Sequence, residues 1–470
     1  MHAQLLIPMV IVIAALGVIG LLALAARAVR VRKRFYFYDI KADSSYDFSR
    51  TCAREISAQV HNGALPLPPK ARPGDAIFAA VRIRATLLGH WFEPRLEIEA
   101  DGQQLTQAFE RGGAGLRYLN LSSLDVSRET TVRLDGKFLH IADQAVTLYY
   151  ISNDLDLDHQ RILVLSPHPD DAEIAAFGLY SNRDSHVVTV TAGEGGGPEY
   201  LGSFAVFGGG ASAYFEKGKT RAWNSVTVPM LGGVPAQRTA NLGYFDETLQ
   251  AMQRHPTVTV ASPHTGAQSL DVFGQAASAR FMLPRAARRA TWSNLVEDLV
   301  YVIENVDPDI IVAPYPLLDG HPDHKMSTAA LLDALRKLNR NRGSLLLYTN
   351  HSVSSLCYPY GSAGDVVSLP PGGSGVPFDG LLSTTLNLDQ QQRKRVALDA
   401  MNDLRPGFPS ASPADALRQL LQTLRIAFTA DDQSYFRRAV RRNELFFEVR
   451  VSSLYEPGIT AAILGTVPAP

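Results

Sequence analysis

The sequence is poor in cysteine and has no excess of charge of either sign. Its two cysteines, Cys52 and Cys357, stand far apart in no metal-type spacing, which argues against a disulfide framework and against sulfur ligation of a metal. The 45 basic residues face 46 acidic ones, so the totals give no sign of nucleic acid or another polyanion as a partner. No internal repeat is apparent. For 470 residues we expect two folded domains plus an appendage.

One long hydrophobic run is present, at the start of the chain. The 22 residues from Leu5 to Ala26 carry no charge, a length that spans a bilayer core of roughly 30 Å. A cleaved signal peptide is the alternative, because Ala26-Arg27-Ala28 resembles a cleavage site, but the leader lacks Lys and Arg and the run exceeds the usual hydrophobic region. A basic cluster follows at Arg27, Arg30, Arg32, Lys33 and Arg34. Residues 1–34 are therefore predicted to be a transmembrane helix with its basic flank, in a single-pass membrane protein whose remaining chain is cytoplasmic.

Residues 35–155 have the pattern of a β-rich, sandwich-like domain. Val81 to Arg84 and Leu96 to Glu99 alternate apolar and charged residues with the period of a strand. Asp101-Gly102 and Asp135-Gly136 are typical of hairpin turns. No polar constellation here suggests chemistry. Packing or presentation, a spacer and glycan binding all stay open as roles.

Residues 156–470 change to an α/β pattern. Short apolar runs occur at 162–165, 187–191 and 310–313, and apolar stripes of helical period at 295–306 and 328–338. Buried parallel strands with crossover helices have this appearance, so we predict a Rossmann-like, doubly wound, mostly parallel sheet. Ligands of such sheets bind beyond the carboxyl ends of the strands, which makes the residues that follow these strands the most informative.

Two loops that follow predicted strands combine imidazole with carboxylate. The first contains His168, Asp170 and Asp171, and the second contains Asp319, His321, Asp323 and His324. Both loops should lie on the same edge of the sheet. A set of His and Asp ligands without thiolate suits Zn²⁺ at a catalytic site, although Fe²⁺ and Co²⁺ accept the same ligands. One member of the Asp170-Asp171 pair can bind the ion while the other faces the bound water as a general base.

The paired His-Pro-Asp-Asp and His-Pro-Asp-His loops resemble those of the LmbE-like, or PIG-L, N-acetylglucosaminyl deacetylases. The resemblance covers roughly residues 160–450 and includes Thr191-Ala192-Gly193-Glu194-Gly195, the Leu242-Gly243-Tyr244 step with Asp246, and the segment from Asn443 to Phe446. It implies one zinc ion per chain and an N-acetylated amino sugar as the substrate from which acetate is released. The predicted anchor and its basic flank, and not the resemblance, suggest a lipid-linked sugar; a glycan-linked one is the alternative.

The same resemblance implies a role for each site residue. His168, Asp171 and His324 would bind zinc, and Asp170 would be the general base. His321, oriented by Asp323, would assist at the tetrahedral intermediate. Arg221 would contact hydroxyl or phosphate groups of the substrate. The chain departs from the family at Asn224 and at Asp319, where Glu and Tyr are common, so the substrate contacts are less secure than the ligands.

Two other functions remain possible on the sequence alone. One keeps the zinc site but cleaves another amide, such as a thiol conjugate. The other is a membrane-tethered glycan-binding protein whose site is vestigial. A Gly-rich connection containing Gly195-Gly196-Gly197 and Gly208-Gly209-Gly210 is either an active-site lid or a plain surface loop.

Overall fold

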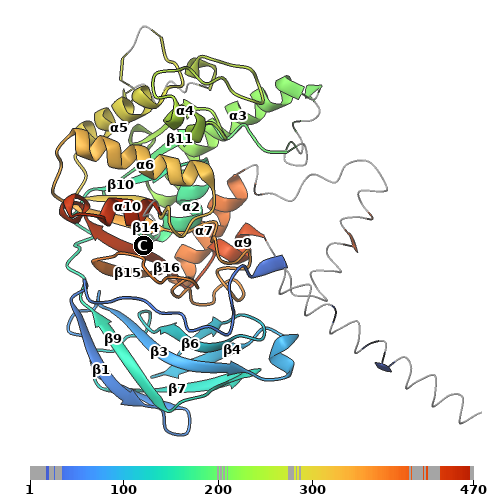
Figure 1. Cartoon of the computed structure of the whole chain (residues 1–470), viewed down its shortest axis with the longest axis vertical. Helices are drawn as coiled ribbons and strands as arrows, with labels where there is room; N and C mark the ends of the chain where they lie inside the picture. The colour runs from blue at the N-terminus through green and yellow to red at the C-terminus, as the bar shows by residue number, and fades with distance from the viewer. Residues whose placement is uncertain are drawn as a thin grey trace, which may run out of the picture.

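A computed structural model describes residues 34–197, 210–273, 287–401 and 434–465, together with isolated residues between and before these ranges. A β-rich part comes first in the chain and an α/β part follows it (Figure 1). β9 (Ala145–Ile151) ends and β10 (Ile162–Ser166) begins on either side of the predicted boundary at residue 155. The division into 1–34, 35–155 and 156–470 itself stays a prediction.

The β-rich part consists of two antiparallel sheets that share one core. One sheet has the strand order β1-β9-β3-β6, with β8 also paired to β3, and the other has the order β2-β7-β4-β5. Apolar residues from both sheets form one buried cluster that includes Leu65, Ile77, Leu96 and Val132. The remaining strands of the two sheets are β1 (Ala53–Gln59), β2 (Ala64–Leu67), β3 (Ala76–Ala85), β4 (Arg95–Ala100), β5 (Gln103–Ala108), β6 (Ala114–Asn120), β7 (Thr130–Lys137) and β8 (Leu139–Ile141).

One of the two predicted hairpin turns in this part is confirmed and the other is wrong. Asp101 and Gly102 join β4 to β5, and both have positive φ, 47° and 77°, as such a turn requires. Asp135 and Gly136 lie inside β7, where Gly136 pairs with Leu96. β7 ends at Lys137, and after Phe138, whose φ is 62°, the chain enters β8, which pairs with β3 in the other sheet. Pairing with β4 therefore overrides the local turn preference of the Asp-Gly dipeptide.

The α/β part is organised by a seven-stranded sheet in the order β12-β11-β10-β13-β14-β16-β15. The first five of these strands are parallel, and the last two are antiparallel to their neighbours. β10 and β13 are adjacent, and the direction in which the parallel strands follow one another reverses between them. Such a reversal leaves a crevice at the carboxyl ends of the two strands. The other strands are β11 (Ser185–Thr191), β12 (Thr239–Tyr244), β13 (Ile310–Pro314), β14 (Ser344–Tyr348), β15 (Gly380–Thr385) and β16 (Asn443–Arg450).

Helices cover this sheet, and the two predicted from apolar stripes are present. α5 (Trp292–Val306) buries Leu295, Leu299 and Val302, and α6 (Pro322–Lys337) buries Leu331 and Leu335. Both belong to one large core cluster with the sheet. The other helices are α2 (Asp171–Tyr180), α3 (Gly210–Thr227), α4 (Leu249–Arg254), α7 (Leu388–Ala400), α9 (Tyr435–Ala439) and α10 (Ile459–Leu464).

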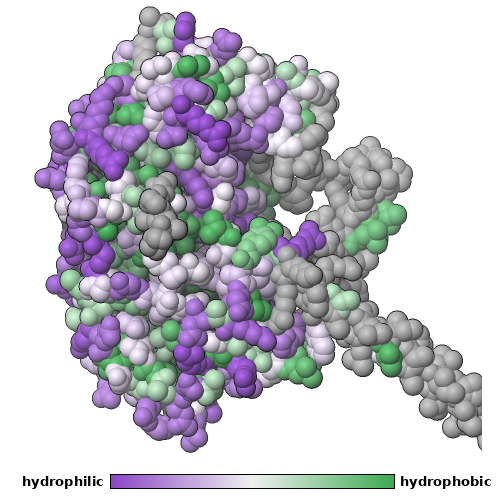
Figure 2. Space-filling model, viewed as in Figure 1, coloured by the Kyte–Doolittle hydropathy of each residue, from purple (hydrophilic) through white to green (hydrophobic). Residues whose placement is uncertain are grey.

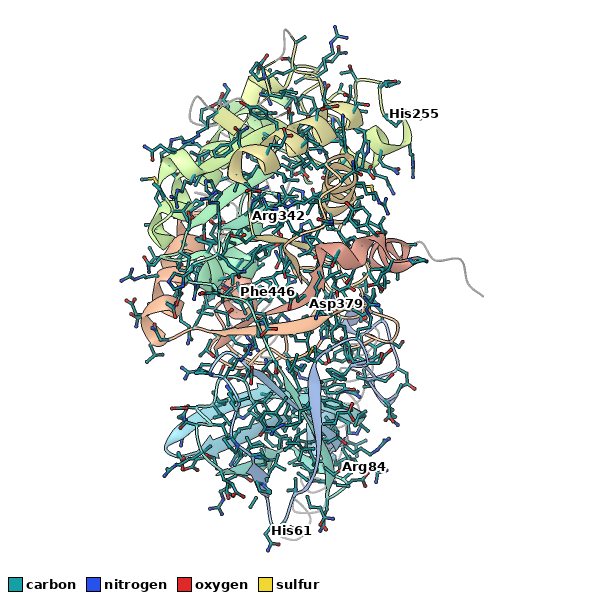
Figure 3. All side chains as sticks on the ribbon, turned by 90° about the vertical axis from the view of Figure 1, so that its left-hand side faces the viewer. His61, Arg84, His255, Arg342, Asp379 and Phe446 are labelled. Atoms are coloured by element: carbon teal, nitrogen blue, oxygen red, sulfur yellow. The ribbon has the colours of Figure 1, made fainter. Side chains whose placement is uncertain are left out.

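The two parts meet through aromatic packing and an ion pair. Phe48 stacks on Tyr149 with ring centroids 4.1 Å apart and contacts Phe378 edge-on at 5.7 Å. Arg50 donates a 2.8 Å bond to Asp379, which lies in the middle of the molecule in Figure 3. The face in Figure 2 mixes hydrophilic and hydrophobic side chains, in keeping with the even charge balance of the sequence.

The predicted mixed α/β class with several sheets is confirmed, whereas its Rossmann-like assignment stays a prediction. The predicted anchor, residues 5–26, lies outside the described residues except at 17, 18, 20 and 26. A span needs about 20 consecutive apolar residues in one helix, and among the described residues no helix is long and apolar enough to cross a membrane. The predicted localisation, a single-pass membrane protein with a cytoplasmic catalytic domain, is contradicted by this finding.

Candidate metal centre

The first predicted loop leaves β10 and enters α2 within four residues. Ser166 donates its hydroxyl to the carbonyl of His168 at 2.6 Å, and the amide of His168 donates to the Asp171 carboxylate at 3.0 Å. These bonds close the loop on itself. Asp170 has a φ of 121°, a backbone conformation that is costly for a residue other than glycine and that persists only where the surroundings enforce it.

The second loop leaves the neighbouring strand β13 and enters α6. His321 is the residue that caps α6, because its Nδ1 accepts a bond from the amide of Asp323 at 3.2 Å. Asp319 accepts a bond from the amide of His321 at 3.0 Å through Oδ1. Its Oδ2 accepts bonds from the amides of Asn350 and His351, which follow β14, at 3.0 and 3.1 Å. Asp319 therefore joins the ends of two parallel strands.

The two loops bring three potential ligand atoms together. His168 Nδ1 lies 3.2 Å from Asp171 Oδ2 and 3.3 Å from His324 Nε2. His324 Nε2 lies 3.0 Å from Asp171 Oδ2. Zinc–nitrogen distances of about 2.0–2.1 Å in a tetrahedron place neighbouring ligand atoms about 3.3 Å apart. The triangle therefore has the size and the donor chemistry that a zinc ion requires.

All three residues are buried, and their charges are coupled. His168, Asp171 and His324 are 7%, 1% and 0% exposed. Burial opposes a charge on His324, but Asp171 and Asp319 outweigh it and raise the pKa of His324 to about 10. Burial likewise opposes a charge on Asp171, but His324 and His168 lower its pKa well below the usual value. A cation can take the place of the imidazole protons in this triangle.

Each imidazole of the triangle is held from behind by a carboxylate. His168 Nε2 lies 3.0 Å from Asp246 Oδ1, and His324 Nδ1 lies 3.1 Å from Asp319 Oδ2. Such carboxylate–histidine pairs fix the tautomer and the orientation of a metal-binding ring. Asp246 follows β12 and Asp319 follows β13, so residues after several parallel strands build the centre together.

Asp170, predicted as the general base, lies beside the triangle and is bound by Arg221. Arg221 Nη2 donates to Asp170 Oδ2 at 3.0 Å and to the carbonyl of Pro169 at 2.6 Å. Its Nη1 donates to the carbonyl of Gly193 at 2.8 Å. The structure thus places Arg221 against the loop of the predicted base. Gly193 is required here, since its φ is +67° and a Cβ would lie 2.6 Å from Arg221 Nη1.

His321 lies at the triangle, but the Asp323 carboxylate does not orient it. The ring of His321 is 4.7 Å from that of His168 and 4.9 Å from that of His324. Burial, together with the charges of His168 and His324, lowers the pKa of His321 to about 4. The Asp323 carboxylate instead accepts bonds from the amides of Glu247 and Leu249, at 2.6 and 3.3 Å. The backbone amide of Asp323 is what holds the His321 ring.

Sequence reasoning missed three residues of this cluster. Asn350 donates its side-chain amide to Asp171 Oδ1 at 2.8 Å. The ring of His351 lies 5.0 Å from that of His324, and Asp171, His324 and His351 form a group with ligand atoms within 4.8 Å of one another. The third is Asp319, which the sequence placed in the second loop without its role behind His324. The apolar run 345–348 marks β14, and reading the residues after it would have found Asn350 and His351.

The fold and the site define an α/β protein with a candidate metal centre at the carboxyl edge of its sheet. Residues 163–335 match the family model described as PIG-L, GlcNAc-PI de-N-acetylase. The resemblance predicted from the two loops is thereby confirmed for this segment. The match supports a deacetylase, whereas the identity of the metal and of the substrate belongs to the proposal below.

The comparison with solved structures finds more distant likenesses. The A40926 pseudoaglycone deacetylase Dbv21 is 19% identical, with 63% of this chain and 99% of that chain covered, at a TM-score of 0.31. The 4-carboxy-2-hydroxymuconate hydratase GalB from Pseudomonas putida KT2440 is 13% identical, with 62% and 96% covered, at a TM-score of 0.30. Scores this low do not identify an activity. Among curated proteins no match is found.

Proposed function

We propose that this protein hydrolyses the N-acetyl amide of an amino sugar and releases acetate in a zinc-dependent reaction. The observation that carries the proposal is the triangle of His168, Asp171 and His324, with sides of 3.0–3.3 Å, beside Asp170. The PIG-L match over residues 163–335 supports the deacetylase part. The Rossmann-like sheet belongs to the same proposal, because the crevice between β10 and β13 is where it would bind a ligand.

His168, Asp171 and His324 would hold the ion. When bound, zinc polarises a carbonyl oxygen and lowers the pKa of water from about 15.7 to about 7. Asp246 and Asp319 orient the two imidazoles for this task, as their distances of 3.0 and 3.1 Å indicate. Iron(II) and cobalt(II) accept the same donors, so the ligand set alone does not select zinc.

Asp170 is the residue we propose to accept the proton of the attacking water and to pass it to the departing nitrogen. Arg221 fixes its carboxylate through the 3.0 Å bond and anchors the surrounding loop through two carbonyls. In this proposal Arg221 positions the base. The family resemblance implies that Arg221 contacts the substrate. Such a contact would have to use N–H groups other than those that already donate to Asp170, Pro169 and Gly193.

His321 is proposed to donate a hydrogen bond to the amide carbonyl oxygen as negative charge develops there. Because its Nδ1 accepts a bond from the amide of Asp323 at 3.2 Å, the proton of the neutral ring is on Nε2. A neutral donor agrees with the lowered pKa, about 4. The hydrogen bond therefore does not require an imidazolium.

The proposal is tested on the purified full chain. Elemental analysis should find one zinc ion per chain, and incubation with a panel of N-acetyl sugars should release acetate. If the protein hydrolyses a thiol-conjugated amide and none of the N-acetyl sugars, its substrate belongs to another class of amides and the sugar part of the proposal is wrong. If the metal-loaded protein binds sugars but hydrolyses none of them, the result would instead support a glycan-binding protein with an inactive site.

A further inference from the structure

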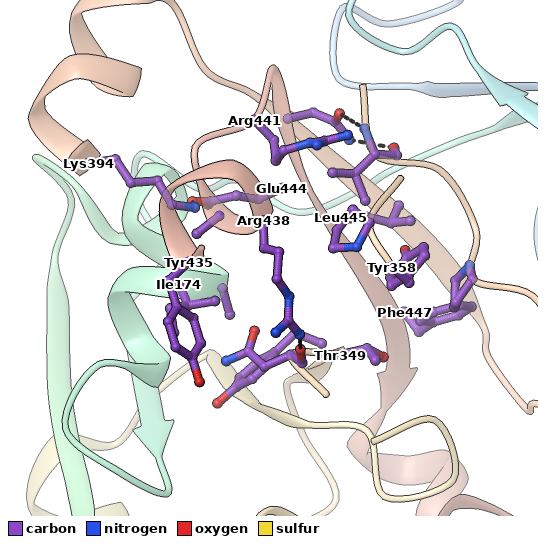
Figure 4. Close-up of a pocket in the computed structure, with 18 residues that line it drawn as sticks. Ile174, Thr349, Tyr358, Lys394, Tyr435, Arg438, Arg441, Glu444, Leu445 and Phe447 are labelled. Carbon is purple, nitrogen blue, oxygen red and sulfur yellow. Dashed lines mark hydrogen bonds and ion pairs between the residues drawn. The ribbon is translucent and has the colours of Figure 1, made fainter. Parts of the chain in front are cut away.

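A cavity of about 60 Å³, whose lining residues are drawn in Figure 4, borders the candidate metal centre through Asn350, which binds Asp171. At ~10–15 Å³ for each water position, it has room for a solute of only a few heavy atoms. Asn350 lines the cavity and donates to Asp171 Oδ1 at 2.8 Å. Ile174 also lines it, and its amide bonds to the carbonyl of Asp170 at 2.9 Å. The cavity therefore lies next to a residue that binds the predicted ligand Asp171 and next to the first turn of α2, which follows the predicted base Asp170.

Tyr348 and Thr349, at the end of β14, line this cavity, and their hydroxyl groups have no hydrogen-bond partner among the described residues. Both hydroxyl oxygens are buried. Buried polar atoms without a partner are rare, and a water or ligand is the usual explanation. Burial raises the pKa of Tyr348 well above its usual value, so the phenol keeps its proton and is able to donate.

Two arginines bring positive charge to the cavity. Arg441 lines it and donates to backbone carbonyls, among them that of Ser362 at 2.8 Å. Arg438 Nη2 donates to the carbonyl of Asn350 at 2.6 Å, and within the described part of the chain no carboxylate forms an ion pair with either arginine. Lys394, which also lines the cavity, is neutralised by Glu444 at 2.7 Å. In Figure 4 the Arg438 side chain extends toward the segment that carries Thr349. An anion in the cavity would meet the Arg438 guanidinium next to two residues whose hydroxyl groups have no partner among the described residues.

We propose that this cavity binds a small carboxylate, the acetate released by amide hydrolysis at the metal centre. Its carboxylate group would bind Arg438, Tyr348 and Thr349, and its methyl group would face the apolar lining that includes Ile174, Val367 and Phe447. The inference rests on the proposed function, because hydrolysis adds water across the C–N bond and leaves acetate beside Asp171. Phosphate fits less well, since its oxygens on the apolar side would have no donor.

The test is a titration of sodium acetate into the zinc-loaded full chain, with binding measured by calorimetry. Removing the charge with Arg438→Met should weaken acetate binding about 10-fold to 100-fold, as expected for a charge-assisted bond. Tyr348→Phe removes only the unpartnered hydroxyl and should weaken binding less. Arg393→Met is the matched control, since Arg393 is exposed and paired with Asp389 on α7 at 2.9 Å. Zinc content is measured in each variant, so that loss of metal is not mistaken for loss of the cavity.

Equal acetate affinity in the wild type and in Arg438→Met would overturn the inference, and so would tighter binding of inorganic phosphate than of acetate. If Arg438→Met does not fold, Tyr348→Phe still decides, because the two side chains have nearly the same shape. If the protein deacetylates sugars but its acetate affinity does not depend on Arg438, the proposed function stands and the proposed acetate cavity is wrong. Arg438-dependent acetate binding in a protein that hydrolyses no amide would support the cavity and remove the proposed function.

Discussion

Asp319 and His324 form a buried pair in which a carboxylate oxygen lies 3.1 Å from Nδ1 of the imidazole, and both side chains are 0% exposed. The pairing leaves His324 Nε2 to face Asp171 at 3.0 Å. The same carboxylate accepts bonds from the amides of His321, Asn350 and His351. A single side chain thus orients a predicted ligand and ties together the loops that follow β13 and β14.

Asp319→Asn should weaken zinc binding about 10-fold to 100-fold, the usual effect of losing a partner behind a metal ligand. The single amide oxygen of Asn can still accept the bonds from the amides of Asn350 and His351, whereas the bond from the amide of His321 to the other oxygen is lost. Competition with a chromophoric chelator measures the affinity. Asp307→Asn is the control, because Asp307 pairs with Arg340 and Arg342 on the surface. Equal zinc affinity in the two variants would show that Asp319 does not support the ligand.

Zinc binding should release protons at neutral pH. In the metal-free protein the pKa of His324 is raised to about 10 and that of His168 well above its usual value, in spite of burial. Since a metal binds the neutral imidazole, apparent affinity should rise with pH across the neutral range. Calorimetry in buffers of different ionisation enthalpy counts the protons. A binding enthalpy independent of the buffer would mean that these imidazoles are already neutral or are not ligands.

Asp170→Ala should keep its zinc and lose turnover by about 10²-fold to 10⁴-fold, the range for a general base. Arg221→Met separates two roles. If Arg221 positions Asp170, as the 3.0 Å bond indicates, kcat should fall with little change in KM. If it binds substrate instead, KM should rise while kcat changes little. Steady-state kinetics on the preferred N-acetyl sugar distinguishes these outcomes, and zinc analysis confirms that both variants are loaded.

The sequence predicted the triangle because its three members follow adjacent parallel strands, and the register of β10 with β13 brings their ends together. The sequence did not predict the direction in which individual side chains point. Arg221 was expected at the substrate and lies against Asp170, and the Asp323 carboxylate binds the amides of Glu247 and Leu249. Those partners come from distant parts of the chain. Side-chain direction depends on packing that one motif does not encode.

Glu194 offers a test of the electrostatics around Asp246. It is 0% exposed, accepts bonds from the amide of Asp246 at 3.1 Å and from Ser262 Oγ at 2.8 Å, and has a pKa raised by burial and by Asp246 to about 8. In the unfolded chain its ordinary value is 4.5. Between these values the folded protein holds a proton that the unfolded chain has lost, so this residue lowers the free energy of unfolding as pH rises through the window.

Glu194→Gln imitates the protonated side chain and removes this pH dependence. The stability difference between the variant and the wild type should become independent of pH well below the ordinary pKa of 4.5, where both the folded and the unfolded wild type bind the proton. Near pH ~8 the variant should be the more stable one, by on the order of a few kcal/mol, since each pKa unit corresponds to about 1.4 kcal/mol. Urea unfolding of the metal-free proteins at several pH values measures the difference. A difference that stays constant with pH would mean that Glu194 has the same pKa in the folded protein as in the unfolded chain, so that burial and Asp246 do not raise it.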